Sequence, residues 1–272
     1  MKTARFASLI MLLWVAACST TPTGRHQLML VSPSQAIQAS AQAYPEKLAP
    51  YARKGKIDND PEQVRRVKRI TGRLIAQAMQ LYPQTRNWPW KVVVIDDPKV
   101  VNAWCMAGGQ MAVYSGLLEK LHLTDDELAQ VMAHEISHAV ANHSAEQMSV
   151  ALASQVGLAV LSATALRDNR YRTAALTGAA LAATVAIELP FSRSAEAEAD
   201  RMGMELAARA GYDPRAALSL WRKMAKVNSD QPPELLNTHP SHEHRLEALE
   251  ALLPKVLPLY HPDEPHPVYT GL

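Results

Sequence analysis

Hydrophobic residues recur at helical spacing in two long stretches of the chain. Between Pro61 and about Tyr82 the apolar face is formed by Val64, Val67, Ile70, Leu74, Ile75 and Met79. Between Thr124 and Val140 it is formed by Leu128, Val131, Met132, Ile136, Ala139 and Val140. Glu127 follows Thr124 at the spacing of a capping box, which predicts that the second helix begins beside Thr124.

Three short apolar stretches between these helices predict strands, and Gly108 and Gly109 separate the last two. The strands are expected over Lys91–Ile95, Val100–Trp104 and Gln110–Tyr114. Further helices are expected from about Ser34 to Pro50 with breaks at Pro45 and Pro50, from Asp213 to about Val227, and from Ser241 to Leu253. The sequence therefore predicts an α+β fold, mostly helical, with a small β-sheet beside the helix that begins at Thr124.

Two alanine-rich stretches, residues 150–166 and 174–189, flank a basic turn. Each falls short of the roughly 20 strongly apolar residues that a membrane-spanning helix needs. They predict a helical hairpin that either packs on the domain or lies against a membrane.

Residues 1–17 have the composition of a secretory signal. Lys2 and Arg5 precede a short apolar run, and two alanines precede Cys18. This order resembles a bacterial lipoprotein processing site, at which Cys18 would become the lipidated first residue. The alternative is an ordinary signal cleaved nearby. Residues 18–32 are then expected to be a polar tether, 33–253 a single domain, and 254–272 a loosely ordered Pro- and His-rich tail.

The charges of the chain are nearly balanced, with 28 basic and 26 acidic residues among 272. Loss of Lys2 and Arg5 with the signal would leave the mature chain formally neutral, which gives no indication of a nucleic-acid partner. Lipidation of Cys18 would leave Cys105 as the only thiol, so no internal disulfide is expected. Cys105 is instead expected to be a small buried hydrophobic residue.

The helix that begins at Thr124 carries the candidate chemistry, in His134, Glu135 and His138. Two histidines four residues apart differ by about 40° of rotation, so both imidazoles leave the same face and can bind one metal ion. Glu135 lies where its carboxylate can reach a water on that metal. This is the pattern of a zinc peptidase, in which zinc acidifies the water and the glutamate takes its proton. The alternative, two buried structural histidines, leaves Glu135 without a role.

A helical two-histidine site needs a third protein ligand. The class of zinc peptidases with a third histidine six residues after the second is excluded, because that position is Ser144. Another class takes a glutamate from a later helix, and Glu196 and Asp200 are four residues apart on one predicted helical face. Glu196 would bind the metal, and Asp200 would accept a hydrogen bond from the free N–H of His134. Glu198 is expected to face solvent; the alternative for the whole segment is an exposed acidic helix start.

These motifs together resemble the CAAX-prenyl-protease-type (HtpX-like) zinc metallopeptidases. Besides the two candidate ligand segments, the matching residues are Asn102-Ala103, Gly108-Gly109, Tyr114 to Leu118, Thr238-His239-Pro240 and Arg245. The resemblance covers roughly Gly24 to Leu253 and is closest to the soluble bacterial periplasmic lipoprotein branch and the related mitochondrial inner-membrane protease. It implies a gluzincin-like endopeptidase with one Zn²⁺ per chain on His134, His138 and Glu196, and places the hairpin between the two ligand helices.

The resemblance also implies that His239 lies near the metal. It would either stabilise the oxyanion of the reaction or cap the zinc as a fourth ligand in a resting state. His143 falls about 140° round the helix from His138 and is not expected to be a ligand. Four histidines near the C-terminus, His242, His244, His261 and His266, are expected at the surface.

The resemblance implies cleavage of unfolded, misfolded or misassembled envelope proteins, with Glu135 as the general base. An edge strand of the small sheet could pair with an extended substrate, and the segment Asn102–Gly109 would line the cleft. The expected location is the periplasm, attached to a membrane through the lipid on Cys18, and Ser19 is typical of lipoproteins sent to the outer membrane. The alternatives are an aminopeptidase with the same zinc chemistry and an outer-membrane assembly factor or chaperone-like protein with latent protease activity.

Overall fold

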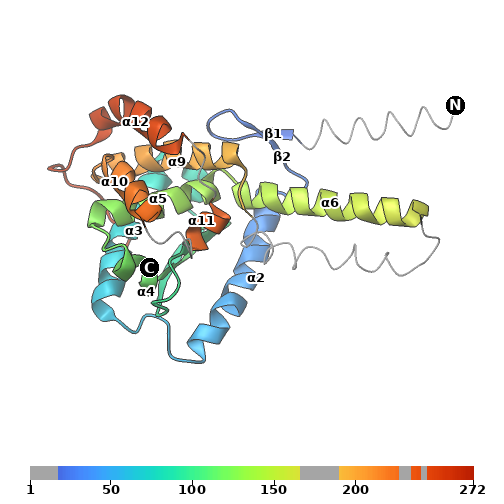
Figure 1. Cartoon of the computed structure of the whole chain (residues 1–272), viewed down its shortest axis with the longest axis horizontal. Coiled ribbons are helices and arrows are strands. Elements are labelled where there is room, and N and C mark those ends of the chain that lie inside the picture. Colours follow the sequence, from blue (N-terminus) through green and yellow to red (C-terminus); the bar gives the residue numbers. More distant parts are fainter. Residues whose placement is uncertain (1–17, 166–189, 227–233, 240–243) are drawn as a thin grey trace.

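The computed structural model of this chain describes residues 18–165, 190–226, 234–239 and 244–272. The expected signal segment 1–17 and the expected second arm of the hairpin, 174–189, lie outside the described residues. A body of helices surrounds a small sheet, and one long helix extends from this body (Figure 1). The predicted α+β, mostly helical fold is confirmed.

Helix α5 (Asp125–Val140) lies at the centre of the body. The Thr124 side chain accepts a hydrogen bond from the Glu127 backbone, and the Glu127 carboxylate accepts one from the Thr124 backbone, so the predicted capping box is confirmed. Every residue from Glu127 to Val140 is buried. The helices packed around α5 are α3 (Pro61–Leu81), α9 (Arg193–Arg209) and α10 (Ala216–Lys226).

A three-stranded sheet packs beside α5. Its order is β3 (Lys91–Ile95), β5 (Gln110–Tyr114) and β4 (Ala103–Met106), with β3 parallel and β4 antiparallel to the central β5. Strands β3 and β5 have the predicted bounds. Strand β4 lies at the edge, so its outer side has no strand partner within the described ranges.

Strand β4 begins three residues later than the predicted stretch from Val100. The reason is the tight turn at Gly108 and Gly109, whose φ angles are 86° and 80°. Glycine adopts this left-handed region without a steric penalty. The Gly109 N–H donates to the Met106 carbonyl at 3.0 Å, and Met106 pairs with Gln110 beside the turn. This register places residues 103–106 opposite β5.

Helix α2 (Pro33–Ala52) packs against the same sheet. The predicted breaks at Pro45 and Pro50 are wrong, because the helix continues through both prolines. The Tyr44 hydroxyl donates to the Met111 carbonyl at 3.0 Å, and its ring lies edge-on to Trp104 with the centroids 5.7 Å apart. This burial against the sheet compensates for the backbone hydrogen bonds that the prolines remove.

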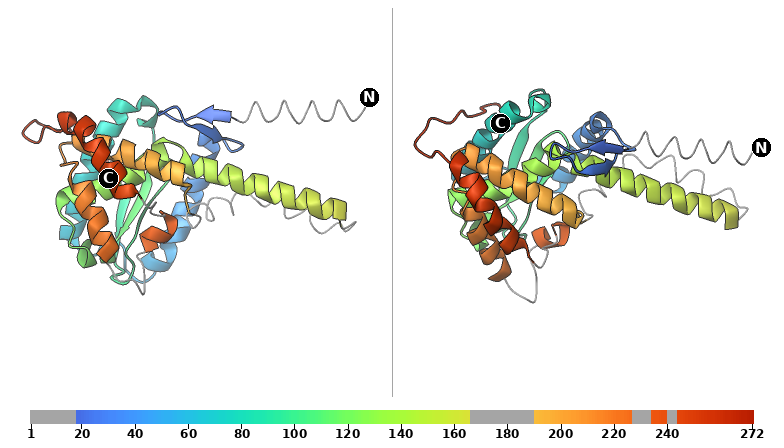
Figure 2. Two further views of the ribbon diagram at one scale, coloured as in Figure 1. Left: turned by 45° about the horizontal axis from the view of Figure 1, so that its top comes forward. Right: turned by 90° about the horizontal axis from the view of Figure 1, so that it is seen from above.

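Helix α6 (His143–Ala165) is the long helix that extends from the body in all views (Figures 1 and 2). Its described length includes most of the expected first arm of the hairpin. Throughout the part of the chain that the structure describes, no helix has both the length and the apolar character needed to cross a bilayer.

The segment 18–32 is more than the tether expected from its composition. Strands β1 (Cys18–Thr20) and β2 (His26–Leu28) form an antiparallel hairpin that lies beside the start of α6 (Figure 2). Gln27 is buried, and its amide donates to the carbonyl of Ala141 at 2.8 Å. The hairpin is thereby attached to the chain just after the end of α5.

The C-terminal region contains the short helix α11 (Glu234–Thr238), α12 (Arg245–Val256) and the 3₁₀ turn η2 (Leu257–Leu259). The expected start of the last helix, Ser241, lies outside the described residues. The tail then returns to the body, where the Tyr269 N–H donates to the Gly72 carbonyl of α3 at 2.9 Å. A Cβ at Gly72 would lie 2.6 Å from the Tyr269 carbonyl oxygen, so glycine permits this approach. The tail, which was expected to be loosely ordered, therefore contacts α3 at Gly72.

Candidate metal centre

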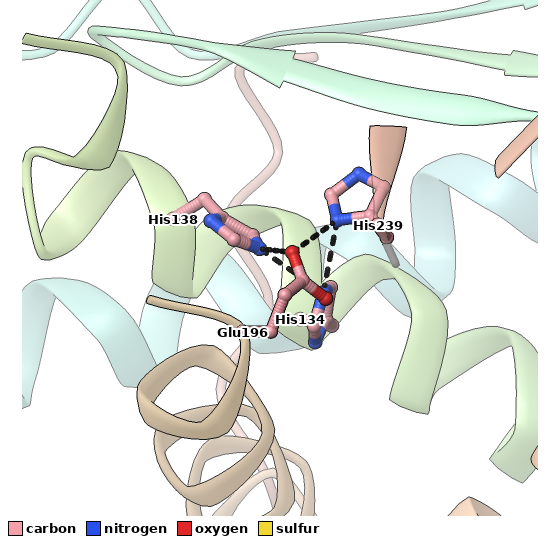
Figure 3. Close-up of side chains that lie close together, drawn as sticks. All are labelled: His134, His138, Glu196 and His239. Atoms are coloured by element: carbon pink, nitrogen blue, oxygen red, sulfur yellow. Dashed lines mark hydrogen bonds and ion pairs between the residues drawn. The ribbon is translucent and has the colours of Figure 1, made fainter. Parts of the chain in front are cut away.

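Helices α5 and α9 bring His134, His138 and Glu196 together, and the three side chains point toward one another (Figure 3). The two Nε2 atoms of the histidines are 3.0 Å apart. Oε1 of Glu196 lies 3.3 Å from Nε2 of His138, and its Oε2 lies 3.5 Å from Nε2 of His134. Gly203 of α9 permits the close approach of the helices, because a Cβ there would lie 3.0 Å from the backbone nitrogen of His134.

His239, which directly follows α11, completes the cluster. Its Nδ1 lies 3.2 Å from Nε2 of His134 and 2.9 Å from Oε1 of Glu196. On its other side, its Nε2 lies 3.3 Å from Oε1 of Glu135. His239 is only 2% exposed, so it belongs to the buried centre and not to a solvated loop.

The four side chains of His134, His138, Glu196 and His239 fit a single metal ion. Their candidate ligand atoms all lie within 4.8 Å of one another. A tetrahedral zinc site with Zn–N distances near 2.0–2.1 Å has edges of about 3.3 Å between ligand atoms, which matches the observed spacings. Oε2 of Glu196 also lies 3.2 Å from Nη1 of the buried Arg245, so this carboxylate faces a guanidinium as well as the histidines.

Asp200 lies where the sequence analysis expects it, behind His134. Its Oδ1 is 3.1 Å from Nδ1 of His134 and 2.6 Å from Nη2 of Arg245. The Arg245 guanidinium is buried and stacks on the Trp221 ring, 3.5 Å from its centroid. From the sequence, Arg245 was predicted only as part of a segment that matches the family. Its charged role was missed, although a buried carboxylate beside a histidine requires such a partner.

At the back of the centre, the expected exposure of Glu198 and the expected position of His143 on the helix of His138 are wrong, whereas among the described residues His143 is not part of the ligand cluster, as predicted. Glu198 does not face solvent: it is 5% exposed and lies 3.1 Å from Nε2 of His143. His143 is outside the four-residue cluster, but it is adjacent to His138, with the two Nδ1 atoms 2.9 Å apart. The helical extrapolation fails because α5 ends at Val140 and Asn142 adopts a left-handed φ of 59° before α6 begins.

The charges around the centre favour an ionised Glu196 surrounded by the three histidines. Burial opposes ionisation of Glu196, yet its contacts with His134, His138 and His239 hold its pKa far below the usual range. Burial also acts against protonation of His134, but Asp200 and Glu196 outweigh it and raise the pKa of His134 to about 9. Burial lowers the pKa of His138 well below its usual value. Histidine binds a metal in its neutral form, so metal binding at this cluster would be coupled to the release of protons.

A cavity of about 270 Å³ opens beside Glu135 and His239. Its wall includes Asn102, Trp104 and Cys105 from the edge of the sheet. Cys105 is buried, as expected, and burial raises the pKa of its thiol. The candidate centre is therefore open toward the edge strand β4.

The other histidines lie away from this centre. His244 and His261 are exposed, as expected, whereas His266 is half-buried and contacts the His261 carbonyl at 2.8 Å. His242 lies outside the described residues.

Comparison with known proteins gives the family of this chain. Residues 61–253 match the model of peptidase family M48. This range includes His134, His138, Glu196 and His239. The chain belongs to peptidase family M48. The small sheet beside the metal-binding helix, with a glutamate from a later helix facing two histidines, is accordingly a gluzincin-like fold.

Several relatives within this M48 family are named metalloendopeptidases. The chain is 38% identical over 160 residues to the mitochondrial metalloendopeptidase OMA1 of Arabidopsis thaliana, covering 59% of this chain and 31% of the relative. It is 32% identical over 244 residues to the human metalloendopeptidase OMA1, covering 86% of this chain and 45% of the relative. It is also 32% identical over 194 residues to the beta-barrel assembly-enhancing protease of Escherichia coli, covering 69% of this chain and 38% of the relative. The chain thus spans 31% to 45% of the length of these relatives.

Proposed function

We propose that this chain is a zinc metalloendopeptidase of the HtpX-like, CAAX-prenyl-protease-type branch, with His134, His138 and Glu196 as the metal ligands. The observation that carries the proposal is the convergence of these three side chains from α5 and α9 at the edge spacings of a zinc site. When bound, zinc supplies Lewis acidity that lowers the pKa of a water and polarises a peptide carbonyl.

Glu135 is the proposed general base. It adjoins both the cluster and the cavity, and its Oε1 has no hydrogen-bond partner among the described residues. Burial raises the pKa of Glu135, so it can accept the proton of the attacking water and pass it to the leaving amine. Asp200 fixes the orientation of His134 by accepting the hydrogen of its Nδ1.

The edge strand β4 is the proposed docking site for the substrate backbone. An extended peptide that pairs with β4 would continue the sheet and cross the cavity beside Glu135. Backbone pairing does not depend on side-chain sequence, which suits a protease that acts on unfolded or misassembled proteins. The proposed substrates are envelope proteins, and the proposed location is the periplasm, with the chain attached to the outer membrane through a lipid on Cys18.

His239 has two possible roles, and the geometry favours one of them. Its Nδ1 lies among the candidate ligand atoms, 2.9 Å from Oε1 of Glu196 and 3.2 Å from Nε2 of His134, although His239 also lines the cavity beside Glu135. We therefore assign it as the fourth ligand of a resting state. In the working enzyme this position would be given up to water.

The decisive experiment compares wild-type protein with Glu135→Gln for zinc content and cleavage of casein. Zinc in both proteins with cleavage only by the wild type would support the peptidase. Full activity of Glu135→Gln would overturn the assignment of the base. Cleavage of peptides with blocked N-termini would exclude an aminopeptidase.

A second candidate function is an outer-membrane assembly factor with latent protease activity. The placement of His239 inside the cluster favours it, because a capped metal is inactive. The similarity to a beta-barrel assembly-enhancing protease is compatible with either function. If Glu135→Gln still rescues a strain that lacks the protein, the assembly role does not need catalysis.

A further inference from the structure

His138 uses both of its ring nitrogens. Nε2 faces the candidate metal ligands, 3.0 Å from Nε2 of His134. Nδ1 faces the opposite way and lies 2.9 Å from Nδ1 of His143. His138 and His143 are 0% and 1% exposed, so no solvent molecule competes at the surface for this contact. The orientation of His138 therefore depends on His143.

The proton positions along this contact follow from the chemistry of a metal ligand. A histidine that binds a metal through Nε2 carries its hydrogen on Nδ1. The Nδ1–H of His138 then donates to Nδ1 of His143, which must be an unprotonated acceptor. His143 consequently carries its own hydrogen on Nε2, and this hydrogen points to Oε2 of Glu198 at 3.1 Å. Glu198 thus fixes the tautomer of His143, and His143 fixes the tautomer of His138.

Glu198 is held as an anion by the N-terminal hairpin. Nε of Arg25 donates to its Oε2 at 2.7 Å, and the Thr23 hydroxyl donates to its Oε1. Glu198 is buried, so its oxygens are satisfied by these two donors and by His143. An ionised Glu198 can only accept, which is the role that the tautomer of His143 requires.

The other histidine ligand, His134, is oriented by a similar set of residues. Nδ1 of His134 faces Asp200, and Asp200 is paired with the buried Arg245. Nδ1 of His138 reaches Glu198 through His143, and Glu198 is paired with Arg25. Each histidine is thus backed by a carboxylate of α9 and an arginine. The difference is that Arg245 belongs to the domain, whereas Arg25 lies between β1 and β2.

We propose that His143, Glu198 and Arg25 form a positioning relay for the metal ligand His138, and that the β1–β2 hairpin thereby sets the metal affinity of the centre. The proposal rests on the proposed metal site and extends it to a segment 113 residues before His138. Arg25 also donates to Glu146 of α6 at 2.9 Å, but the hairpin has a further attachment, because Gln27 donates to the Ala141 carbonyl at 2.8 Å and to Glu146 at 3.0 Å. A change at Arg25 can therefore act on the relay while the hairpin stays attached.

The first test measures the zinc dissociation constant by competition with a chromophoric chelator. Loss of a group that orients a metal-binding histidine typically weakens metal affinity about 10–100-fold, and His143→Leu is expected to fall in this range. His143→Asn is the conservative variant, because its Oδ1 can accept from His138 where Nδ1 did. It is expected to recover most of the lost affinity.

The second test uses changes at the hairpin end of the relay, where folding is less at risk. Arg25→Gln and Glu198→Gln are expected to weaken zinc binding several-fold and to alter the visible spectrum of the Co²⁺-loaded protein, which reports ligand geometry. The matched control is Arg66→Gln, which removes another arginine that donates to a carboxylate at 2.7 Å, that of Asp125. The control should leave zinc affinity and spectrum unchanged.

The outcomes separate this proposal from the proposed function. Tight zinc binding by the wild type with no change in His143→Leu and Arg25→Gln would overturn the relay alone. Equal loss of affinity in Arg66→Gln would also overturn it, because the effect would then be one of general stability. A wild-type protein that binds no zinc would overturn the metal site itself.

Discussion

Oδ1 of Asp200 lies 3.1 Å from Nδ1 of His134, one helical turn beyond Glu196 on α9. A single helix therefore supplies both a candidate metal ligand and the carboxylate that orients a histidine ligand on α5. The same oxygen of Asp200 accepts from Arg245 at 2.6 Å, so the carboxylate has a counter-charge where water is excluded.

Asp200→Asn should weaken zinc binding about 10–100-fold, because the neutral amide orients His134 less firmly and leaves the buried Arg245 with Glu196 as its remaining charged partner. Chelator competition on purified protein measures this effect. Asp125→Asn is a suitable control, since Asp125 pairs with Arg66 and Arg69 at a partly exposed site. Unchanged zinc affinity in Asp200→Asn would contradict the assigned role.

Removal of the metal should reduce both activity and stability. A ligand that binds only the folded state stabilises it, by about 4 kcal/mol when its free concentration is 1,000 times Kd. Dialysis against a chelator is therefore expected to lower Tm, and added Zn²⁺ should restore it. A chelator-treated protein with unchanged Tm and cleavage would argue against a structural or catalytic metal. Glu196→Ala should show the low Tm without chelator, and zinc should not restore it.

Glu127 should give the protein part of its resistance to acid. Burial opposes ionisation of Glu127, but hydrogen bonds from Lys223, the Thr124 backbone and Ser219 outweigh it and lower its pKa. A pKa lowered by folding contributes stability above the unfolded value, near ~4.3 for glutamate, and this contribution is lost as the pH falls through the folded value.

The change Glu127→Gln tests this contribution. At neutral pH its Tm should be lower than that of the wild type, and the difference should shrink as the pH is lowered below about 4.3. The control is Glu62→Gln, in the exposed first turn of α3. A difference in Tm that stays constant with pH would show that Glu127 acts through packing and not through its charge.

Gly72→Ala should lower Tm when residues 265–272 are present and raise Tm when they are removed. Alanine in a helix is usually about 1 kcal/mol more favourable than glycine. Here the added Cβ would lie 2.6 Å from the Tyr269 carbonyl oxygen and 3.0 Å from a methyl group of Val268. In the full chain the substitution is expected to lower Tm, and in a chain that ends at Glu264 it should raise Tm. The same sign in both chains would show that the tail does not constrain α3.

Local sequence patterns predicted most of the helices and strands. Where a prediction from sequence was wrong, the cause is a long-range contact or an irregular backbone. The capping box lies within one chain segment, so the start of α5 beside Thr124 was predicted correctly, whereas its end at Val140 was not, because His143 was placed on the same helix. The contacts of Glu198 could not be predicted in this way. Its partner Arg25 is 173 residues away, and the direction of His143 depends on the left-handed backbone at Asn142. Spacing rules describe regular helices and give no information once a helix ends.

His239→Ala distinguishes a metal cap from an oxyanion donor. The Nδ1 of His239 lies 3.2 Å from Nε2 of His134 and 2.9 Å from Oε1 of Glu196, which places it as a fourth ligand atom. Loss of a fourth ligand should weaken zinc binding and at the same time open the position that a water must occupy. We expect a larger zinc dissociation constant together with faster casein cleavage when zinc is supplied in excess. An oxyanion donor would give the reverse pattern, with zinc affinity unchanged and kcat reduced about 10²–10³-fold.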